Sequence, residues 1–228
     1  MKIVSWNCHS TFGKGLHEDK ATKFYELLEK GEFVPDILVL QEINEDEIQN
    51  LRGFSSSLWY GDHKNAEPGG IAIFWKDPYR IKRVPEFDSK FRYVVPYRVT
   101  GGREPFTLFA VWTKGEPLYY ENNVIEAIKH YSIEKQSIVI GDYNTFAHNA
   151  DTKYRHLVNC ARNTEAGKNT FYSPRYKFGI DDFCFATPDI ANKIDAKICQ
   201  DSETEWEEQS KLWRGLSDHC PISVEFNL

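Results

Sequence analysis

The chain has 228 residues and a formal net charge of −6. This length suffices for one large domain with a substantial core, so we expect a single domain over residues 1–228. The acidic balance argues against non-specific coating of nucleic acid, which needs many cationic phosphate contacts, although a divalent cation and a local basic strip still allow a polyanion to bind.

The cysteine content argues against a zinc site. The five cysteines are an odd number without C-x-x-C spacing, and reduced thiols in a cytoplasmic compartment are the simpler interpretation. No apolar run approaches the length of a membrane span, and residues 2–6 already have a strand pattern. We therefore expect neither stable membrane insertion nor a cleaved signal peptide.

The first half of the chain alternates apolar strands with short helical segments. Residues 2–7 have a strand pattern, and residues 20–30 carry apolar side chains at helical spacing before Gly31. The continuous apolar run at 37–40 is typical of a strand buried on both faces. Further along, we expect a short helix at 44–50, a strand at 71–75 and an antiparallel series near 80–85, 91–99 and 105–112.

The second half continues this mixture. Helical spacing is found at 121–131, a fully apolar strand at 137–140 and a helical pattern at 152–160. The remaining strands are expected at 178–185, 196–199 and 222–226. Antiparallel runs thus mix with strands reached through helices, which predicts an α/β sandwich with mixed sheets and helices outside.

Polar clusters stand at the ends of the apolar runs. In chain order they are Trp6-Asn7, Gln41-Glu42, Gly141-Asp142-Tyr143-Asn144, Asp181-Asp182 and Ser217-Asp218-His219. A carboxylate at the end of a buried strand needs compensation, which Mg²⁺ provides by accepting oxygen ligands. Each cluster alone also fits a turn or a solvated strand end. Together they predict one active site assembled from the whole chain.

The side chains in these clusters suit the hydrolysis of a phosphate ester. Asp142 can accept a proton from water, and Asn144 can both donate and accept hydrogen bonds. Successive strand side chains point to opposite faces, so only one of Asp181 and Asp182 can face the pocket. A carboxylate partner favours the protonated form of His219, which suits it to stabilise a phosphoryl centre.

The motifs Ser-Trp-Asn, Leu-Gln-Glu, Gly-Asp-Tyr-Asn, Ile-Asp-Asp-Phe and Leu-Ser-Asp-His-Cys-Pro-Ile follow one another between Ser5 and Ile222. This series resembles the endonuclease/exonuclease/phosphatase (DNase I-like) superfamily, which includes nucleases, abasic-site endonucleases, sphingomyelinases and inositol-polyphosphate 5-phosphatases. The resemblance implies a four-layer αββα sandwich, with two mixed β-sheets packed face to face and helices outside. It also implies an active site at one edge of the two sheets.

The resemblance implies a metal site and a set of catalytic residues. Glu42 would be a direct ligand of Mg²⁺, with Mn²⁺ as the alternative ion, and Asn7 and Asp218 would lie beside it. The implied catalytic residues are Asp142, Asn144, Asp181 and His219. Asp142 would orient or deprotonate the attacking water and Asn144 would hold the scissile phosphate. Asp181 would pair with His219, which would stabilise the developing charge.

Two positions depart from the family pattern. Many relatives carry His or Tyr after the strand that precedes Gly-Asp-x-Asn, and here Trp112 takes that place, which cannot act as an acid or base. The abasic-endonuclease group usually carries an acid two residues past the first Asn, where this chain has His9. Neither a site with two catalytic histidines nor close membership of the abasic group is therefore expected.

The expected substrate contacts are less specific. Arg175 either grips a flanking phosphate or keeps the surface polar. Trp206 and Trp213 either stack on a base or cover a sheet edge. His9 either contacts phosphate or is a loop residue without a role. The candidates for substrate contact are Arg175, His9, Trp112 and Trp213.

The leading hypothesis is a Mg²⁺-dependent nuclease that cleaves phosphodiester bonds of DNA or RNA by in-line attack of water. The alternative is a phosphatase or phosphodiesterase of a small molecule or lipid headgroup, of the inositol phosphate or sphingomyelin type. The acidic balance and Trp112 favour this alternative. A catalytically silent binding module is least expected, because the whole set of polar clusters is present.

Overall fold

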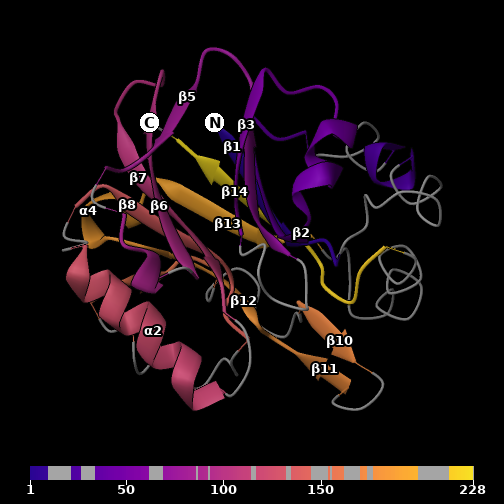
Figure 1. Ribbon diagram of the computed structural model, residues 1–228. Helices are drawn as coiled ribbons and strands as arrows, with labels where there is room; N and C mark the ends of the chain where they lie inside the picture. The colour runs from indigo at the N-terminus through magenta and orange to yellow at the C-terminus, as the bar shows by residue number, and fades with distance from the viewer. Residues whose placement is uncertain are drawn as a thin grey trace.

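The computed structural model describes residues 1–9, 22–26, 34–61, 69–85, 87–91, 93–113, 117–131, 135–144, 154, 156–161, 170–173, 177–199 and 216–227. Within these residues, the strands form two six-stranded sheets and one two-stranded ribbon (Figure 1). The ribbon pairs β10 (Phe171–Ser173) with β11 (Lys177–Gly179).

The first sheet has the strand order β13-β14-β1-β2-β4-β3. Its strands are β1 (Lys2–Asn7), β2 (Ile37–Ile43), β3 (Ser56–Gly61), β4 (Gly70–Trp75), β13 (Ile194–Ile198) and β14 (Ile222–Phe226). β1 and β2 run parallel, and the other neighbours run antiparallel. The central strands are buried almost throughout, which is why they appear in the sequence as continuous apolar runs.

The second sheet has the order β5-β6-β7-β8-β12-β9. Its strands are β5 (Arg80–Arg83), β6 (Val94–Thr100), β7 (Phe106–Trp112), β8 (Ser137–Asp142), β9 (Val158–Asn159) and β12 (Asp182–Ala186). Here β7 and β8 are the parallel pair and the other neighbours run antiparallel. Both sheets are therefore mixed, with one parallel pair at the centre of each.

The two sheets pack face to face over a common core. Ile3 and Val39 of the first sheet belong to the same buried cluster as Leu108 and Ile140 of the second. Because side chains alternate along a strand, every second residue of these strands enters this layer, and the others face outward toward the helices.

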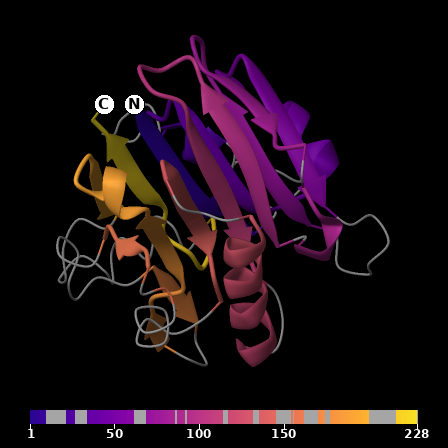
Figure 2. The same ribbon diagram turned by 90° about the vertical axis from the view of Figure 1, so that its left-hand side faces the viewer.

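Helices cover the outer faces. Phe24, in the helical segment 22–26, stacks on Trp6 of the first sheet with ring centroids 4.9 Å apart. α2 (Pro117–His130) packs Val124, Ala127 and Ile128 against the second sheet (Figure 2). The shorter elements are the 3₁₀ helices η1 (Glu45–Asn50) and η2 (Ser89–Phe91) and the helix α4 (Pro188–Ala191). The predicted four-layer αββα sandwich is confirmed. In the part of the chain that the structure describes, no helix is long and apolar enough to cross a membrane.

Some elements differ from the sequence-based expectation. The predicted helix at 152–160 is wrong where the structure describes it, because Val158–Asn159 forms β9 and pairs with β12. The predicted strand at 178–185 is divided between β11 and β12. It is interrupted because the N–H groups of Asp181 and Asp182 both donate to the hydroxyl of Thr170, 3.0 Å away in each case. β3, β10 and α4 were not predicted.

A substitution at Gly141 tests the close packing of β8 against β7. Its φ is +144°, and a Cβ at this position would collide with the carbonyl oxygen of Val111. We expect Gly141→Ala to lower the free energy of unfolding by more than about 2 kcal/mol in urea denaturation, from combined backbone strain and collision. Gly53→Ala is the matched control, since Gly53 has φ +86° in open space. It should cost only about 1 kcal/mol. Equal losses would contradict the collision.

Candidate active site

The polar clusters that follow β1, β2 and β8 meet those that precede β12 and β14 at one edge of the sandwich. The antiparallel strands β12 and β14 begin where the parallel strands end, so carboxyl ends and amino ends share this edge. Asp182 and Asp142 stand directly opposite each other in the β8–β12 ladder. The edge lies at the end of the molecule near the β10–β11 ribbon, away from the two termini (Figure 1).

Asn7 links the two sheets at this edge. Its Nδ2 donates to Oε1 of Glu42, in the same sheet, over 3.0 Å. The same nitrogen donates to Oδ2 of Asp142, in the other sheet, over 2.9 Å. Its Oδ1 accepts from the backbone N–H of His9 over 3.1 Å. This fully engaged and buried amide sets the distance between two carboxylates from different sheets.

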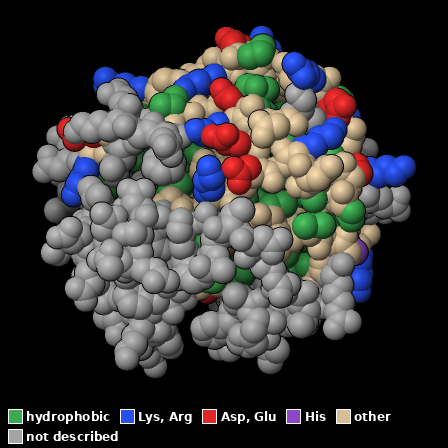
Figure 3. Space-filling model, turned by 180° about the vertical axis from the view of Figure 1, so that it is seen from behind, with side chains coloured by type: hydrophobic (Ala, Val, Ile, Leu, Met, Phe, Trp, Pro, Cys, Tyr) green, Lys and Arg blue, Asp and Glu red, His purple; other side chains and the backbone are tan. Residues whose placement is uncertain are grey.

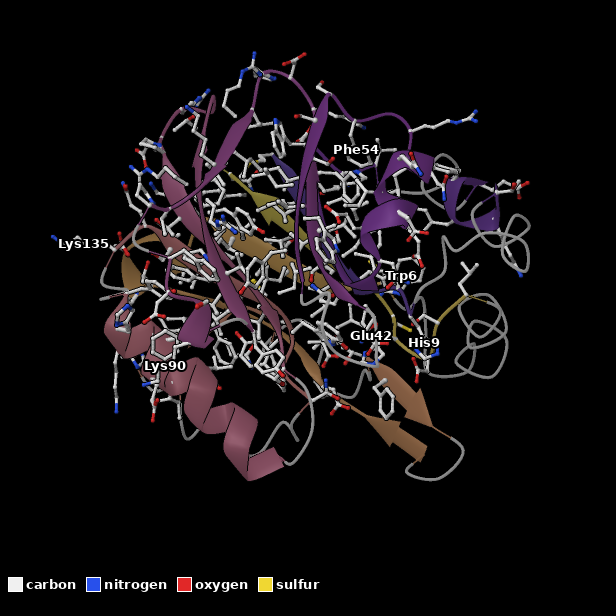
Figure 4. All side chains as sticks on the ribbon, in the orientation of Figure 1. Trp6, His9, Glu42, Phe54, Lys90 and Lys135 are labelled. Atoms are coloured by element: carbon white, nitrogen blue, oxygen red, sulfur yellow. The ribbon has the colours of Figure 1, made fainter. Side chains whose placement is uncertain are left out.

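Glu42 is held by a strained backbone and two polar neighbours. It occupies a bulge in β2 with φ +55°, and His9 has φ +45°. Nδ1 of His9 lies 3.0 Å from Oε2 of Glu42, and Figure 4 shows the two side chains together at the end of the sheets. Burial raises the pKa of Glu42, but the hydrogen bonds from His9 and Asn7 outweigh it and bring the pKa to about 2. Glu42 is therefore ionised at neutral pH.

Asp142 is fully buried and has both oxygens bonded. The backbone N–H of Asn144 donates to Oδ1 over 2.8 Å, and Nδ2 of Asn144 donates to Oδ2 over 3.0 Å. Nδ2 of Asn144 also donates to the carbonyl of Thr113 over 2.6 Å. Burial raises the pKa of Asp142 to about 8, although the positive charge of His219 opposes this shift. Such a carboxylate can exchange a proton near neutral pH.

His219 pairs with Asp182, so the expected pairing with Asp181 is wrong. Nδ1 of His219 lies 2.8 Å from Oδ2 of Asp182. The strand begins at Asp182, and this residue faces the same side as Asp142, whereas Asp181 precedes the ladder. Burial disfavours the imidazolium of His219, but the nearby carboxylates of Asp182 and Asp142 outweigh it and raise the pKa of His219 to about 10. His219 is therefore a buried cation.

Two other acids line the same edge. Nε2 of His219 lies 4.0 Å from Oδ2 of Asp142 and 4.0 Å from Oδ1 of Asp218, whose side chain is 45% exposed. Asp181 is half-buried, and burial followed by the charge of Asp182 raises the pKa of Asp181 to about 7. The structure thus brings every predicted catalytic and metal-side residue to one edge, with Asp182 added.

Two hydroxyl groups position the site and were missed as such by the sequence analysis. The hydroxyl of Thr170 accepts from the N–H groups of Asp181 and Asp182, and its carbonyl accepts from Cys220 N–H over 2.7 Å. The hydroxyl of Ser217 donates to the carbonyl of Asn7 over 2.7 Å and accepts from His219 N–H over 3.1 Å. Ser217 was visible within Ser-Asp-His, but Thr170 lies outside any apolar run and had no comparable signal.

The donor atoms at this edge fit a divalent cation. Ligand atoms of Asp142, Asp182 and His219 lie within 4.8 Å of one another, a spacing that can hold an ion. There, however, the hydrogen-bonded imidazolium of His219 already compensates the acids. Outside this group of three residues, Glu42 is ionised and Asp218 is partly exposed. Carboxylate and amide oxygens are the ligands that Mg²⁺ prefers, so Glu42 with its neighbour Asn7, and the partly exposed carboxylate of Asp218, are the candidates for holding an ion.

The predicted substrate contacts are placed only in part. Arg175, Trp206 and Trp213 lie outside the described residues. The side chain of Trp112 is 7% exposed and belongs to the core between the sheets. A Cβ added at Gly69 would lie 2.9 Å from the Trp112 ring and 3.8 Å from Cα of Glu42. Gly69 therefore lies close to both the Trp112 ring and the backbone of Glu42, and the almost complete burial of Trp112 leaves little of it for a ligand to contact.

A family model and several solved structures are similar to this chain. The model of the Endonuclease/Exonuclease/phosphatase family matches residues 4–195. The comparison with curated proteins found no match. Among solved structures, the AP endonuclease LMAP from Leishmania major superposes with a TM-score of 0.70 at 15% identity, covering 100% of this chain and 87% of that one.

Two further structures contain DNA products. The 3′ phosphatase NExo from Neisseria, bound to a product DNA hairpin, has a TM-score of 0.66 at 19% identity, and the superposition covers 100% of this chain and 100% of that one. D. rerio TDP2, complexed with a single strand DNA product, has a TM-score of 0.67 at 14% identity, with 100% of this chain and 99% of that one covered. At these identities the likeness establishes the fold.

The pairing of His219 can be tested by comparing two neighbouring acids. Asp182→Asn removes the charge that stabilises the imidazolium, so we expect kcat for hydrolysis of bis(p-nitrophenyl) phosphate to fall by about 10²-fold. Asp181→Asn is the matched change one residue away and should lower kcat by less than about tenfold. A larger loss from Asp181→Asn would restore Asp181 as the partner.

Thr170 provides a test of backbone positioning. Thr170→Val keeps the shape but leaves two N–H groups without their acceptor, which should lower the free energy of unfolding by about 2 kcal/mol or more. The displacement of Asp182 should also lower kcat by about tenfold. Thr170→Ser restores the acceptor and should recover most of both quantities. Wild-type behaviour of the valine variant in urea denaturation and in turnover would exclude this role.

Proposed function

The chain belongs to the Endonuclease/Exonuclease/phosphatase family of phosphoesterases, and on this premise we propose that it is a Mg²⁺-dependent nuclease that hydrolyses phosphodiester bonds of DNA or RNA. The observation that carries the proposal is the convergence of Glu42, Asp142 and His219 at one sheet edge, joined by the Asn7 amide and the Asp182 carboxylate. These groups offer a metal-side carboxylate, a base and a buried cation within one network.

In this proposal, each catalytic side chain has one task. Asp142 orients the attacking water and accepts its proton, a task for which its raised pKa is suited. Asn144 contacts the scissile phosphate, and its bonds to both oxygens of Asp142 keep that carboxylate oriented. His219, held as an imidazolium by Asp182, stabilises the negative charge that develops on the phosphoryl group. Asp181 is half-buried beside Asp182 and interacts electrostatically with both Asp182 and His219.

Glu42, Asp218 and Asn7 would hold the metal ion. When bound, the ion supplies positive charge that polarises the phosphate and stabilises the displaced oxygen. Mg²⁺ is proposed because the donors are oxygen atoms, and Mn²⁺ is the alternative because it accepts the same ligands. His9, hydrogen-bonded to Glu42, stands where it can also contact a phosphate.

Nucleic acid is the substrate class that we favour. Two similar structures, NExo and TDP2, were solved with DNA products, which supports DNA as a substrate here. On the face shown in Figure 3, acidic and basic side chains of the described residues are interspersed. Among the described residues, this face has no broad basic surface, and we propose that binding depends on local contacts at the site by Arg175, Trp112 and Trp213.

A phosphorylated small molecule or lipid headgroup is the second candidate substrate. Two observations favour it: the net charge of −6 and the buried Trp112 at the place where many relatives carry a second acid or base. A cytoplasmic location is proposed with either substrate. The five cysteines are all reduced thiols in the structure, which is the state that a reducing compartment maintains.

A substrate panel tests the proposal. The protein is incubated with Mg²⁺ and with plasmid, abasic oligonucleotide, RNA or phosphoinositides, in parallel with Asp142→Asn and His219→Ala variants. We expect cleavage of a nucleic acid, loss of cleavage with EDTA and a fall in kcat of about 10²-fold or more for each variant.

The other outcomes discriminate between the alternatives. Turnover of phosphoinositides alone would transfer the assignment to the second candidate. An unchanged rate in Asp142→Asn would exclude it as the base, and a loss under tenfold in His219→Ala would contradict its role as charge stabiliser. If no substrate is turned over and calorimetry detects no Mg²⁺ binding, the chain is a binding module.

A further inference from the structure

Two cysteines stand opposite each other in the β9–β12 ladder. Their strands are antiparallel, with Phe185 opposite Asn159 and Ala186 opposite Val158. The ladder extends one residue further, because Cys160 N–H donates to the carbonyl of Cys184 over 2.9 Å. Directly opposed residues point to the same face of a sheet, so the two thiols lie on the same side.

The geometry of this pair suits a disulfide. Hydrogen-bonded partners in an antiparallel ladder have Cα atoms about 5.5 Å apart, within the range of about 4.4–6.8 Å that disulfides span. The Cys160 thiol, which donates to the carbonyl of Val158 over 3.5 Å, interacts with the Cys184 thiol, and this interaction lowers the pKa of Cys160 and raises that of Cys184. A disulfide would therefore form without a change of strand register.

The surroundings give the two thiols different access to solvent. Cys184 is completely buried in the core between the sheets. Cys160 is partly buried, packs against the same core and follows β9, which is the edge strand of its sheet. A small oxidant therefore meets Cys160 first, with Cys184 behind it. This arrangement is that of an attacking thiol and a resolving thiol.

We propose that Cys160 and Cys184 form a reversible disulfide, a redox-modification site separate from the proposed phosphoesterase chemistry. Hydrogen peroxide is the oxidant. The Cys160 thiolate attacks one peroxide oxygen, the O–O bond breaks and the leaving hydroxide takes up a proton to become water. Cys184 then attacks the sulfenic sulfur, the S–S bond forms, the S–O bond breaks and a second water leaves. Two thiols are oxidised by two electrons and one peroxide is reduced to two waters.

This site connects an edge strand to the strand that begins with Asp182. Cys184 lies two residues from Asp182 on the same face of β12. The disulfide would join β9 to β12 by a covalent bond, and a dithiol reductant would reverse it. Oxidation would thus change the covalent structure of β12 close to the candidate site, although none of the site's own residues would be oxidised.

Peptide mapping tests the proposal. The folded protein is treated with hydrogen peroxide, the peroxide is removed with catalase, and free thiols are alkylated with N-ethylmaleimide in denaturant at neutral pH. Trypsin then releases Cys160 in peptide 156–162 and Cys184 in peptide 178–193. We expect these peptides joined, with a mass two hydrogens below their sum, and separate again after dithiothreitol. Cys160→Ser should abolish the joined species, and Cys199→Ser, at a buried thiol elsewhere, should leave it unchanged.

The contrary results are equally specific. Recovery of both peptides with alkylated thiols, while the protein remains folded by circular dichroism, would overturn the proposal. So would Cys160 found only as sulfinic acid, or joined to a second copy of the chain on a non-reducing gel. Loss of the joined species in Cys199→Ser would also contradict it, because that thiol takes no part in the ladder.

Discussion

The hydrogen bonds of the Asn7 amide are the interaction on which the candidate site depends. They join Glu42 of one sheet to Asp142 of the other, over 3.0 and 2.9 Å. Two carboxylates brought together in a buried place repel each other unless donors and cations compensate them. Asn7 supplies the donors and His219 the cation, and the remaining acidic edge is suited to a divalent ion. The packing of the two sheets is thus tied to the chemistry at their edge.

Backbone strain is concentrated at the same edge. Among the described residues, the non-glycine residues with positive φ are His9, Glu42, Asn144 and Gln136, and the first three lie in the site. Such conformations cost about 1–3 kcal/mol each and persist only where the surroundings determine them. Here the buried strands beneath, together with the bonds of Asn7 and Asp142, provide that determination. These backbone conformations direct the side chains of His9, Glu42 and Asn144 toward the candidate site.

Single hydroxyl groups connect segments that are distant in the chain. Thr170 holds the backbone of Asp181 and Asp182, while Ser217 bonds both Asn7 and His219. Each hydroxyl bonds backbone groups where regular strand pairing stops, so these N–H and carbonyl groups stay hydrogen-bonded at the site. β12 begins at Asp182, and this start of the strand decides which of the two adjacent acids reaches the histidine.

The sequence by itself determined the layers of the fold and the polar clusters that meet at the candidate site. Apolar runs such as 37–40 and the helical spacing at 121–131 are local patterns, and the polar clusters stand at strand ends where parallel and antiparallel strands share an edge. Only the tertiary structure decided that Asp182 pairs with His219, that Thr170 supports it and that Cys160 faces Cys184. These contacts depend on the register between strands that are far apart in the chain, because a shift of one residue reverses which side chains face each other.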